Sequence, residues 1–276
     1  MPWHARLSLD YTHRNGRTAT HFTHDGPLRV LRSLYPEGPG ICHHVLVHPP
    51  GGLVGGDTLD ITVRVQEGAH ALVTTPGATR FYRSEGEEAL QHTTLQLDAG
   101  ARLEWLPLEA IAYNGCLARN QLQWQLAPGA ELITWDITAL GLPHAQQPWL
   151  QGEMLQHMEW PGQWLERGRI QACDHLLLDS QLGMAGQRCL ATLVLACGDA
   201  LSRTRKENLL DATRELLDAH PQGLWCGVTS PHDHMVVLRG LAPVVEPLMQ
   251  LWQKVWALWR TQLWQLPAPR PRIWSM

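Results

Sequence analysis

The stretch Glu67-Gly68-Ala69-His70-Ala71-Leu72-Val73 sets the pattern from which the fold is predicted. Two later stretches have the same form: Ala99-Gly100-Ala101-Arg102-Leu103-Glu104-Trp105 and Pro128-Gly129-Ala130-Glu131-Leu132-Ile133-Thr134. Each consists of a Gly-Ala turn followed by the apolar alternation of a strand. The three glycines recur about every 30 residues, which is a spacing that stacked supersecondary units produce.

The regions that precede these turns also alternate between apolar and polar residues. Their apolar members are Leu59, Ile61, Val63 and Val65, then Leu95 and Leu97, then Leu122, Trp124 and Leu126. Such alternation places one face of a strand inward and the other outward. Repeated strand–turn–strand units therefore predict a mainly β, layered and solenoid-like scaffold. An ordinary sandwich of β-meanders is the alternative.

Helical periodicity appears only in the C-terminal third of the chain. Ser202 is expected to cap a helix over about 202–219, which ends at His220-Pro221. A second helix is expected over about 243–263. We expect one domain over 1–276, in which both helices pack on a β-rich part formed by residues 1–200.

The second helix has two adjacent apolar stripes, where one would suffice for packing on a sheet. One stripe contains the tryptophans Trp252, Trp256 and Trp259. Either the helix is buried on both sides within its own domain, or this stripe docks a partner protein. The second interpretation follows from the dominance of aromatic anchors in interfaces.

Composition limits the classes of partner. The chain has 276 residues, with 44% hydrophobic and 17% charged residues and a formal net charge of −4. This balance gives no electrostatic reason to expect nucleic acid or an anionic membrane as a partner. Few charges leave more neutral and apolar surface, which slightly favours a function inside a complex.

Targeting signals and cysteine usage indicate the compartment. The N-terminus, Met1-Pro2-Trp3-His4-Ala5-Arg6, lacks the basic stretch and apolar core of a secretory signal. No run approaches the roughly 18 apolar residues of a membrane span. The six cysteines form no Cys-x-x-Cys pair and are interpreted as buried reduced thiols. We therefore expect a cytoplasmic protein.

Two dense stretches stand out from the strand pattern. The first, His48-Pro49-Pro50-Gly51-Gly52-Leu53-Val54-Gly55-Gly56-Asp57, is not a phosphate loop, because it lacks the lysine that such a loop needs. It is not a dinucleotide fingerprint either, since a strand and not a helix follows it. The second, Thr74-Thr75-Pro76-Gly77-Ala78-Thr79-Arg80-Phe81-Tyr82-Arg83-Ser84, groups hydroxyls and arginines around a Pro-Gly turn. It is either an anion pocket or a polar loop.

Histidines are the candidate metal ligands. His43 and His44 are adjacent on an expected strand and point to opposite faces, so they do not easily share one ion. His232 and His234 would share a face and are the better pair. No recognisable metal-site spacing or nucleophile signature accompanies them.

Asp136 and Glu166 are isolated carboxylates in apolar surroundings. Such a carboxylate is usually structural and paired with a nearby cation. A pair of them suits the acid–base chemistry of a glycosidase if they stand about 5–10 Å apart. Oxygen ligands of this kind also suit passing contacts with a hydrated divalent cation.

Taken together, these segments resemble the UreD (UreH) family of urease accessory proteins. The matching pieces are 48–57, 74–84, Leu-Glu-Trp-Leu-Pro at 103–107, Glu109-Ala110-Ile111, Trp135-Asp136 and Pro271-Arg272-Ile273-Trp274. They occur in the family's order over nearly the whole chain. The resemblance implies a β-rich fold with two helices and no catalytic turnover.

The resemblance also implies partners and a cargo. Family members bind the helical accessory protein UreF, which carries the GTPase UreG, and this assembly docks on apo-urease. Nickel is expected to be in transit through a water-filled channel, with no cofactor permanently bound. By motif position, the residues expected to line the channel are Asp57, Thr75, Ser84, Asp136 and Glu166. Contacts that release an ion must each be weak, so the lack of a classifiable metal motif suits a conduit.

Two other functions remain as alternatives. One is a β-solenoid carbohydrate-active enzyme that uses Asp136 and Glu166 as its carboxylate pair. The other is a nickel-storing protein that depends on His232 and His234.

Overall fold

The computed structural model describes residues 2–275. Its strands are β1 His4–Arg14, β2 Arg17–Asp25, β3 Arg29–Val30, β4 Ile41–Val47, β5 Thr58–Val65, β6 His70–Thr74, β7 Thr79–Phe81, β8 Ala89–Leu97, β9 Arg102–Leu106, β10 Ala110–Ala112, β11 Cys116–Leu126, β12 Glu131–Leu142, β13 Gln147–Pro148, β14 Gly152–Trp160, β15 Trp164–Gln171, β16 Cys189–Cys197, β17 Cys226–Thr229 and β18 Met235–Ala242. Its α-helices are α1 His175–Asp179, α2 Arg203–Asp218 and α3 Val245–Trp264, and its 3₁₀ turns are η1 Pro143–Ala145, η2 Pro221–Trp225 and η3 Arg272–Ser275.

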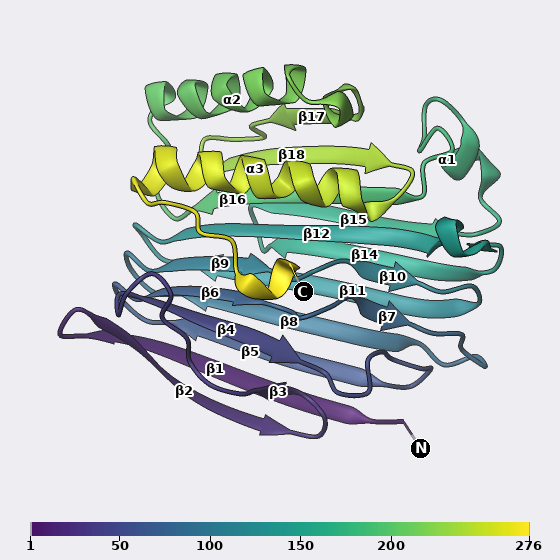
Figure 1. Ribbon diagram of the computed structural model, residues 1–276, viewed down its shortest axis with the longest axis horizontal. Helices are drawn as coiled ribbons and strands as arrows, with labels where there is room; N and C mark the ends of the chain where they lie inside the picture. The colour runs from purple at the N-terminus through teal and green to yellow at the C-terminus, as the bar shows by residue number, and fades with distance from the viewer. Residues whose placement is uncertain (1, 276) are drawn as a thin grey trace.

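The strands form two facing sheets that the chain visits in turn. The smaller sheet has the order β15-β14-β11-β8-β5-β1-β2, and the main path of the larger sheet is β17-β18-β16-β12-β9-β6-β4-β3. Consecutive coils run from β5 to β6, from β8 to β9 and from β11 to β12, and each strand pairs in parallel with its counterpart in the next coil. The coils stack from β1 and β2 at the bottom of Figure 1 to the helices at the top. The predicted solenoid-like β scaffold is confirmed.

The Gly-Ala turns join the two sheets at the same end of every coil. Gly68, Gly100 and Gly129 have positive φ angles of 68°, 64° and 72°, which glycine adopts without steric cost. The Gly68 N–H donates to the Ala99 carbonyl at 3.3 Å, and the Gly100 N–H donates to the Pro128 carbonyl at 3.1 Å. These hydrogen bonds continue the backbone pairing of neighbouring coils through the turns. The Gly-Ala repeat of about 30 residues in the sequence therefore corresponds to one coil of the solenoid.

A short third side closes the opposite end of the coils. Here β7 pairs in parallel with β10, and β10 pairs in parallel with residues 138–140 of β12. Leu53 adds a single parallel bridge to Phe81. The glycine-rich stretch 48–57 therefore belongs to the same stacked wall as the stretch 74–84.

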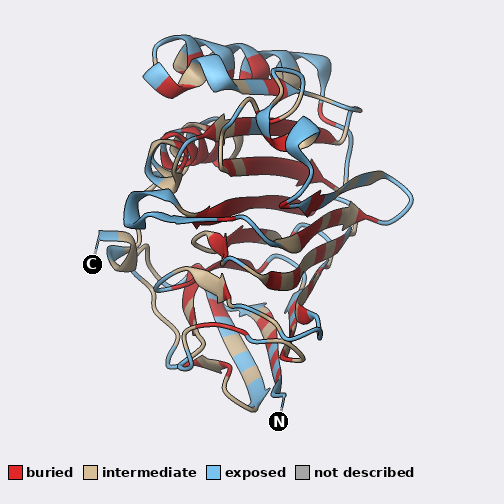
Figure 2. Ribbon diagram, turned by 90° about the vertical axis from the view of Figure 1, so that its right-hand side faces the viewer, coloured by how far each residue is buried: buried red, intermediate tan, exposed pale blue. Residues whose placement is uncertain are grey.

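Antiparallel strands cap both ends of the parallel stack. β1 and β2 form a hairpin at the N-terminal end, and β15, β16, β18 and β17 extend the sheets at the other end. The central strands of the larger sheet, β6, β9, β12 and β16, are almost wholly buried on both faces (Figure 2). Every residue of β12 except Leu142 is buried, because the smaller sheet covers one face and the helices cover the other.

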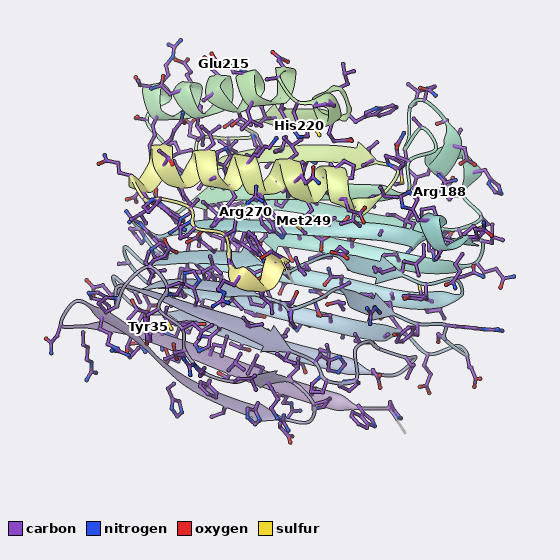
Figure 3. The ribbon with its side chains drawn as sticks, viewed as in Figure 1. Tyr35, Arg188, Glu215, His220, Met249 and Arg270 are labelled. Atoms are coloured by element: carbon purple, nitrogen blue, oxygen red, sulfur yellow. The ribbon has the colours of Figure 1, made fainter. Side chains whose placement is uncertain are left out.

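Helices α2 and α3 form where the sequence predicts them: α3 packs on the outer face of the larger sheet, and α2 packs against α3 and the edge strand β17 at the top of Figure 1. Ser202 is the N-cap of α2, and its side chain accepts a hydrogen bond from the Arg205 N–H. Glu215, labelled above α2 in Figure 3, belongs to the exposed face of this helix. No helix within the described part of the chain is long and apolar enough to cross a membrane.

Helix α1 was not predicted from the sequence. It has five residues, too few to show helical periodicity, and begins at the N-cap Asp174, whose side chain accepts from the Leu177 N–H. Arg188, labelled beside it in Figure 3, anchors the helix by donating from Nη2 to Asp179 Oδ1 at 2.6 Å.

The prediction that all six cysteines are buried is only partly correct. All six are free thiols, as predicted, and four of them are buried. Cys173 is exposed and Cys226 is half-buried, so the expectation that all are buried is wrong for these two. Cys173 lies in the loop before α1 and Cys226 on the edge strand β17, which are places the strand pattern did not define.

The tryptophan stripe of α3 faces the protein's own core. Trp252, Trp256 and Trp259 are each 0% exposed and pack among the apolar residues between α3 and the larger sheet. Trp259 Nε1 donates to Thr213 Oγ1 of α2 at 3.0 Å. A side chain with no exposed surface does not contact a partner in this fold. The expectation that these three residues dock a partner is therefore wrong, and the first interpretation, burial on both sides, holds.

A buried ion-pair network fastens α3 to the sheet. Arg260, which is 0% exposed, donates to both carboxylate oxygens of Glu37 at 3.1 and 2.8 Å. Its Nε lies 3.5 Å from Glu104, which also accepts from Trp256 Nε1 at 2.5 Å. Burial acts to raise the pKa of Glu37, but hydrogen bonds from His43 and Arg260 outweigh it and lower the pKa.

Removing this guanidinium should be costly. Arg260→Ala leaves Glu37 and Glu104 buried without their cation, and we expect the free energy of unfolding to fall by about 3–5 kcal/mol. Urea denaturation measures the loss. The matched control is Arg203→Ala on α2, which removes only an exposed i,i+4 pair with Glu207 and should change stability little. Equal losses in the two variants would contradict the network's role.

Candidate functional site

The two dense stretches of the sequence contact each other directly. The Leu53 N–H donates to the Arg80 carbonyl at 2.7 Å, and the Tyr82 N–H donates back to the Leu53 carbonyl at 2.8 Å. A Cβ on Gly52 would lie 2.4 Å from the Tyr82 ring and 2.8 Å from the Arg80 carbonyl oxygen. Only glycine allows the loop to approach β7 this closely.

Three of the expected channel residues hold their own loops together. Asp57 accepts from the N–H groups of Trp3 at 2.8 Å and Val54 at 3.0 Å. Thr75 donates to the Gly77 carbonyl at 3.0 Å and accepts from the Leu108 N–H at 2.9 Å. Ser84 accepts from the Gly86 N–H at 3.1 Å and donates to the Glu87 carbonyl. Among these three, only Thr75 lines the cavity described next.

A cavity of about 200 Å³ lies behind the glycine loop. Its walls come from both dense stretches and from the strands beneath them: Leu46, Val47, His48, Gly51, Gly52, Leu59, Ile61, Thr75, Pro76, Gly77, Ala78, Thr79, Arg80, Gln91, Trp105 and Pro107. Gln91 belongs to β8, so this cavity reaches the space between the two sheets.

From Gln91 a line of polar side chains crosses the interior. Gln91 Nε2 donates to Asn120 Oδ1 at 3.2 Å, and Asn120 Nδ2 donates to Asp136 Oδ2 at 2.6 Å. Asp136 Oδ1 accepts from Gln156 Nε2 at 2.5 Å and from Thr138 Oγ1 at 2.9 Å. We call these five residues the interior polar layer.

Strand register aligns this layer. Asn120 of β11 pairs with Gln91 of β8 on one side and with Gln156 of β14 on the other. In parallel strands, paired residues point to the same face, so the three amides all point inward. Asp136 and Thr138 reach them from β12 of the facing sheet.

Glu166 ties the two sheets together at the C-terminal end of the stack. Its carboxylate accepts from Thr192 Oγ1 of β16 at 2.6 Å and from Arg239 Nε of β18 at 2.6 Å. The Arg239 side chain is about half exposed, so this group reaches the surface. The structure thus places Glu166 in an ion pair and Asp136 in a neutral environment.

Electrostatics distinguish Asp136 from the other buried carboxylates. Burial raises its pKa to about 6, and the nearby charge of Glu166 adds to the rise. Hydrogen bonds from Thr138, Gln156 and Asn120 act in the opposite direction. Near neutral pH the group carries a negative charge that only neutral donors stabilise, which suits attraction of a cation.

The interior also contains polar atoms without a protein partner. Within residues 2–275, Thr134 Oγ1 of β12 and Trp124 Nε1 of β11 are buried and have no protein hydrogen bond. Buried polar groups are nearly always satisfied, and water fills that role where protein does not. These two atoms are therefore exceptions, and they add to the polar character of the interior around Asp136.

The histidine pair does not form a metal site of the usual kind. The His234 N–H donates to His232 Nδ1 at 3.2 Å, and His234 Nδ1 bonds the Cys197 carbonyl at 3.0 Å. In the described residues no group of three or more His, Cys, Asp or Glu side chains is placed to hold a metal ion. His43 and His44 point to opposite faces, as predicted, toward Glu37 and Tyr11 respectively.

Sequence reasoning missed the amides of the polar layer and Arg239. The three amides belong to no sequence motif. Strand pairing between β8, β11 and β14 brings Gln91, Asn120 and Gln156 side by side, although they are distant in the sequence. One signal was available: Asn120 shares the parity of the inward residues Leu122 and Trp124 and is polar where apolar residues are expected.

Comparison with known proteins gives a consistent result. The family model described as UreD urease accessory protein matches residues 4–275. A protein of a Polaromonas species and one of Paracidovorax citrulli, both called urease accessory protein UreD, are 61% identical to this chain over 276 residues, covering all of both chains. A protein of the same name from Leptothrix cholodnii is 54% identical over 99% of each chain.

The contact between the glycine loop and β7 can be tested with one methyl group. Gly52→Ala forces a Cβ into the Tyr82 ring and the Arg80 carbonyl, and we expect a loss of about 1–3 kcal/mol in urea unfolding. Gly77→Ala is the matched control, because a Cβ there meets nothing within 4 Å. The control should be unchanged or slightly more stable. A Gly52 variant as stable as the control would contradict the close approach.

The raised pKa of Asp136 has a defined effect on stability. The folded-state pKa of about 6 lies above the roughly 3.9 of a free aspartate, so ionisation costs more in the folded protein. Stability from this group is therefore greatest below about pH 4 and falls by up to about 3 kcal/mol as pH rises through 6. Asp136→Asn, which cannot ionise, should gain stability relative to the parent between pH 4 and 7.5.

Urea unfolding across this pH range measures the difference. Asp233→Asn is the control: a hydrogen bond from Lys206 and its charge lower the pKa of Asp233, so the stability difference between this variant and the parent should change little above about pH 4. A stability difference between Asp136→Asn and the parent that stays constant from pH 4 to 7.5 would show that the pKa of Asp136 is not raised.

Proposed function

The chain belongs to the UreD urease accessory protein family, which gives it a role in urease maturation, and we propose that it conducts nickel to apo-urease as a cytoplasmic scaffold without catalysis. The observation that carries this proposal is the interior polar layer, which extends from the cavity behind the glycine loop to Asp136. Glu166 continues the polar contacts toward the surface at Arg239. Nickel is the cargo of this route and is not held as a cofactor.

The chemistry of the layer suits a cation in transit. Asn and Gln side chains offer carbonyl oxygens that rotate toward an ion, and Asp136 supplies one buried negative charge. Amide oxygens and water bind a divalent ion more weakly than a cluster of thiolates or imidazoles does. Weak and repeated contacts of this kind allow an ion to enter and leave.

The channel residues expected from the family enter the proposal in two ways. Asp136 and Glu166 supply charge along the route, and Thr75 shapes the cavity wall, where its hydroxyl is bonded to Gly77 and Leu108. Asp57 and Ser84 act by fixing the loops that form the entrance, through the backbone bonds described above. His232 and His234 have a minor part at most, as transient contacts.

The partners follow the family expectation. In this proposal the chain binds UreF, receives nickel from the GTPase UreG through UreF, and docks with them on apo-urease. Val54 of the glycine loop and Trp3, whose N–H donates to Asp57 of that loop, are exposed and provide apolar contacts for a partner. They take the place of the buried α3 tryptophans as the docking anchors.

The carbohydrate-active alternative gains no support from these contacts. Glu166 is committed to an ion pair with Arg239, and Asp136 is enclosed by three neutral donors. A glycosidase acid and its partner must face one sugar in a shared cleft. Nickel storage is also disfavoured, because the His232 and His234 pair lacks a third ligand among the described residues.

The test is nickel loading of urease in cells that express the urease subunits, the other accessory proteins and a variant of this chain. Asp136→Asn and Glu166→Gln remove charge from the route with little change in volume. We expect each to lower the nickel content of purified urease several-fold, measured by mass spectrometry, while the accessory complex still forms in a pull-down. Asp233→Asn, an exposed change of the same charge, is the control and should load nickel fully. Full loading by both interior variants would refute the route.

A further inference from the structure

The cavity behind the glycine loop contains a cation without a partner. Arg80 lines this cavity, is half-buried, and makes no side-chain hydrogen bond or ion pair with any residue in the range 2–275. Its Nη1 lies 3.7 Å from the position that a Cβ on Gly51 would occupy, so the guanidinium sits against the loop backbone. Taking a charge partly out of water without a counter-charge is unfavourable.

Two further hydrogen-bonding groups line the same cavity and are also free. The His48 imidazole and the Thr79 hydroxyl have no side-chain hydrogen bond to another described residue. The Thr75 hydroxyl is different, because Gly77 and Leu108 already occupy it. The cavity therefore offers a guanidinium fork, an imidazole and a hydroxyl to whatever enters.

Among the described residues that line the cavity, Arg80 carries the charge, which is positive, while Asp57 and Glu109 lie outside the lining. Burial lowers the pKa of His48, although the charge of Asp57 acts against this, so the imidazole is neutral near pH 7. The Asp57 carboxylate is itself occupied by two backbone N–H groups. Glu109 is close enough for Arg80 to oppose the rise in its pKa, yet it forms no ion pair with Arg80.

We propose that this cavity binds a small planar monoanion, a carboxylate or bicarbonate, through bidentate contact with Arg80 and hydrogen bonds from Thr79 and His48. The guanidinium fork matches two coplanar oxygens on one carbon. A single positive charge suits a monoanion better than phosphate, which approaches a double charge near pH 7. Leu46, Ile61 and Trp105 form apolar walls, which accept the body of a small organic acid.

This site goes beyond the proposed nickel route and would stand if that route failed. If both exist, they are connected, because Gln91 of the interior polar layer lines the same cavity. A bound anion would neutralise Arg80 and remove its repulsion of a cation entering there.

Isothermal titration of the full chain tests the site without nickel. Sodium acetate, sodium bicarbonate and sodium phosphate are titrated separately at pH 7.5 in matched ionic strength. We expect acetate, bicarbonate or both to bind one site with a Kd of about 1 mM, which suits a ligand of a few atoms. The tighter binder of the two shows whether the site prefers an organic carboxylate or bicarbonate. Phosphate binding as tight as either would overturn the assignment to a planar monoanion.

Matched variants locate the binding. Arg80→Gln should weaken it at least tenfold, and Thr79→Val should weaken it by less. Arg83→Gln is the control, since Arg83 lies three residues after Arg80 but lines a different hollow with Tyr82 and Tyr113. Circular dichroism checks that each variant is folded, and Arg80→Lys, which keeps the charge and loses the fork, replaces Arg80→Gln if needed. No saturable binding by the parent chain, or unchanged binding in the Arg80 variant, would overturn the proposal.

Discussion

The in-register parallel stacking of the coils determines where every interior side chain of this protein lies. Each coil turns at a glycine of positive φ, and the turn N–H groups continue the ladder from one coil to the next. A slip of one residue would exchange the inner and outer faces of a strand. Because the turns prevent that slip, residues about 30 positions apart in the chain become neighbours in space. The interior polar layer is a direct product of this alignment.

Charge is handled differently on the two faces of the larger sheet. On the outer face, Glu104 and Glu131 have cationic partners, Arg260 for the first and Arg205 for the second. On the inner face, Asp136 has only neutral donors. The outer pairs are complete and fasten the helices to the sheet. The inner carboxylate keeps an unbalanced charge in a space that also contains unsatisfied polar atoms, and the proposed nickel route rests on this combination.

The sequence predicted the elements with strong periodicity and left undetermined those that depend on distant contacts. The recurring Gly-Ala turns and Ser202 identified the stack and the start of α2, since both are local signals. The tryptophan stripe of α3 was ambiguous, because the residues that bury it come from segments distant in the sequence. Trp274, near the end of the chain, packs against Trp256 with ring centroids 5.4 Å apart, and no pattern within the helix could show this. The amides of the polar layer depend on distant contacts in the same way, and within the sequence only the strand parity of Asn120 pointed to one of them.

The proposed conduction of nickel requires that a nickel ion enters the space between the sheets at Asp136. Crystals of the full chain soaked in a nickel salt, with X-ray data collected above and below the nickel absorption edge, test this requirement. We expect anomalous density of partial occupancy between the sheets, within contact of the Asp136 carboxylate and its amide neighbours. Density confined to histidines on the outer surface, with none between the sheets, would contradict it.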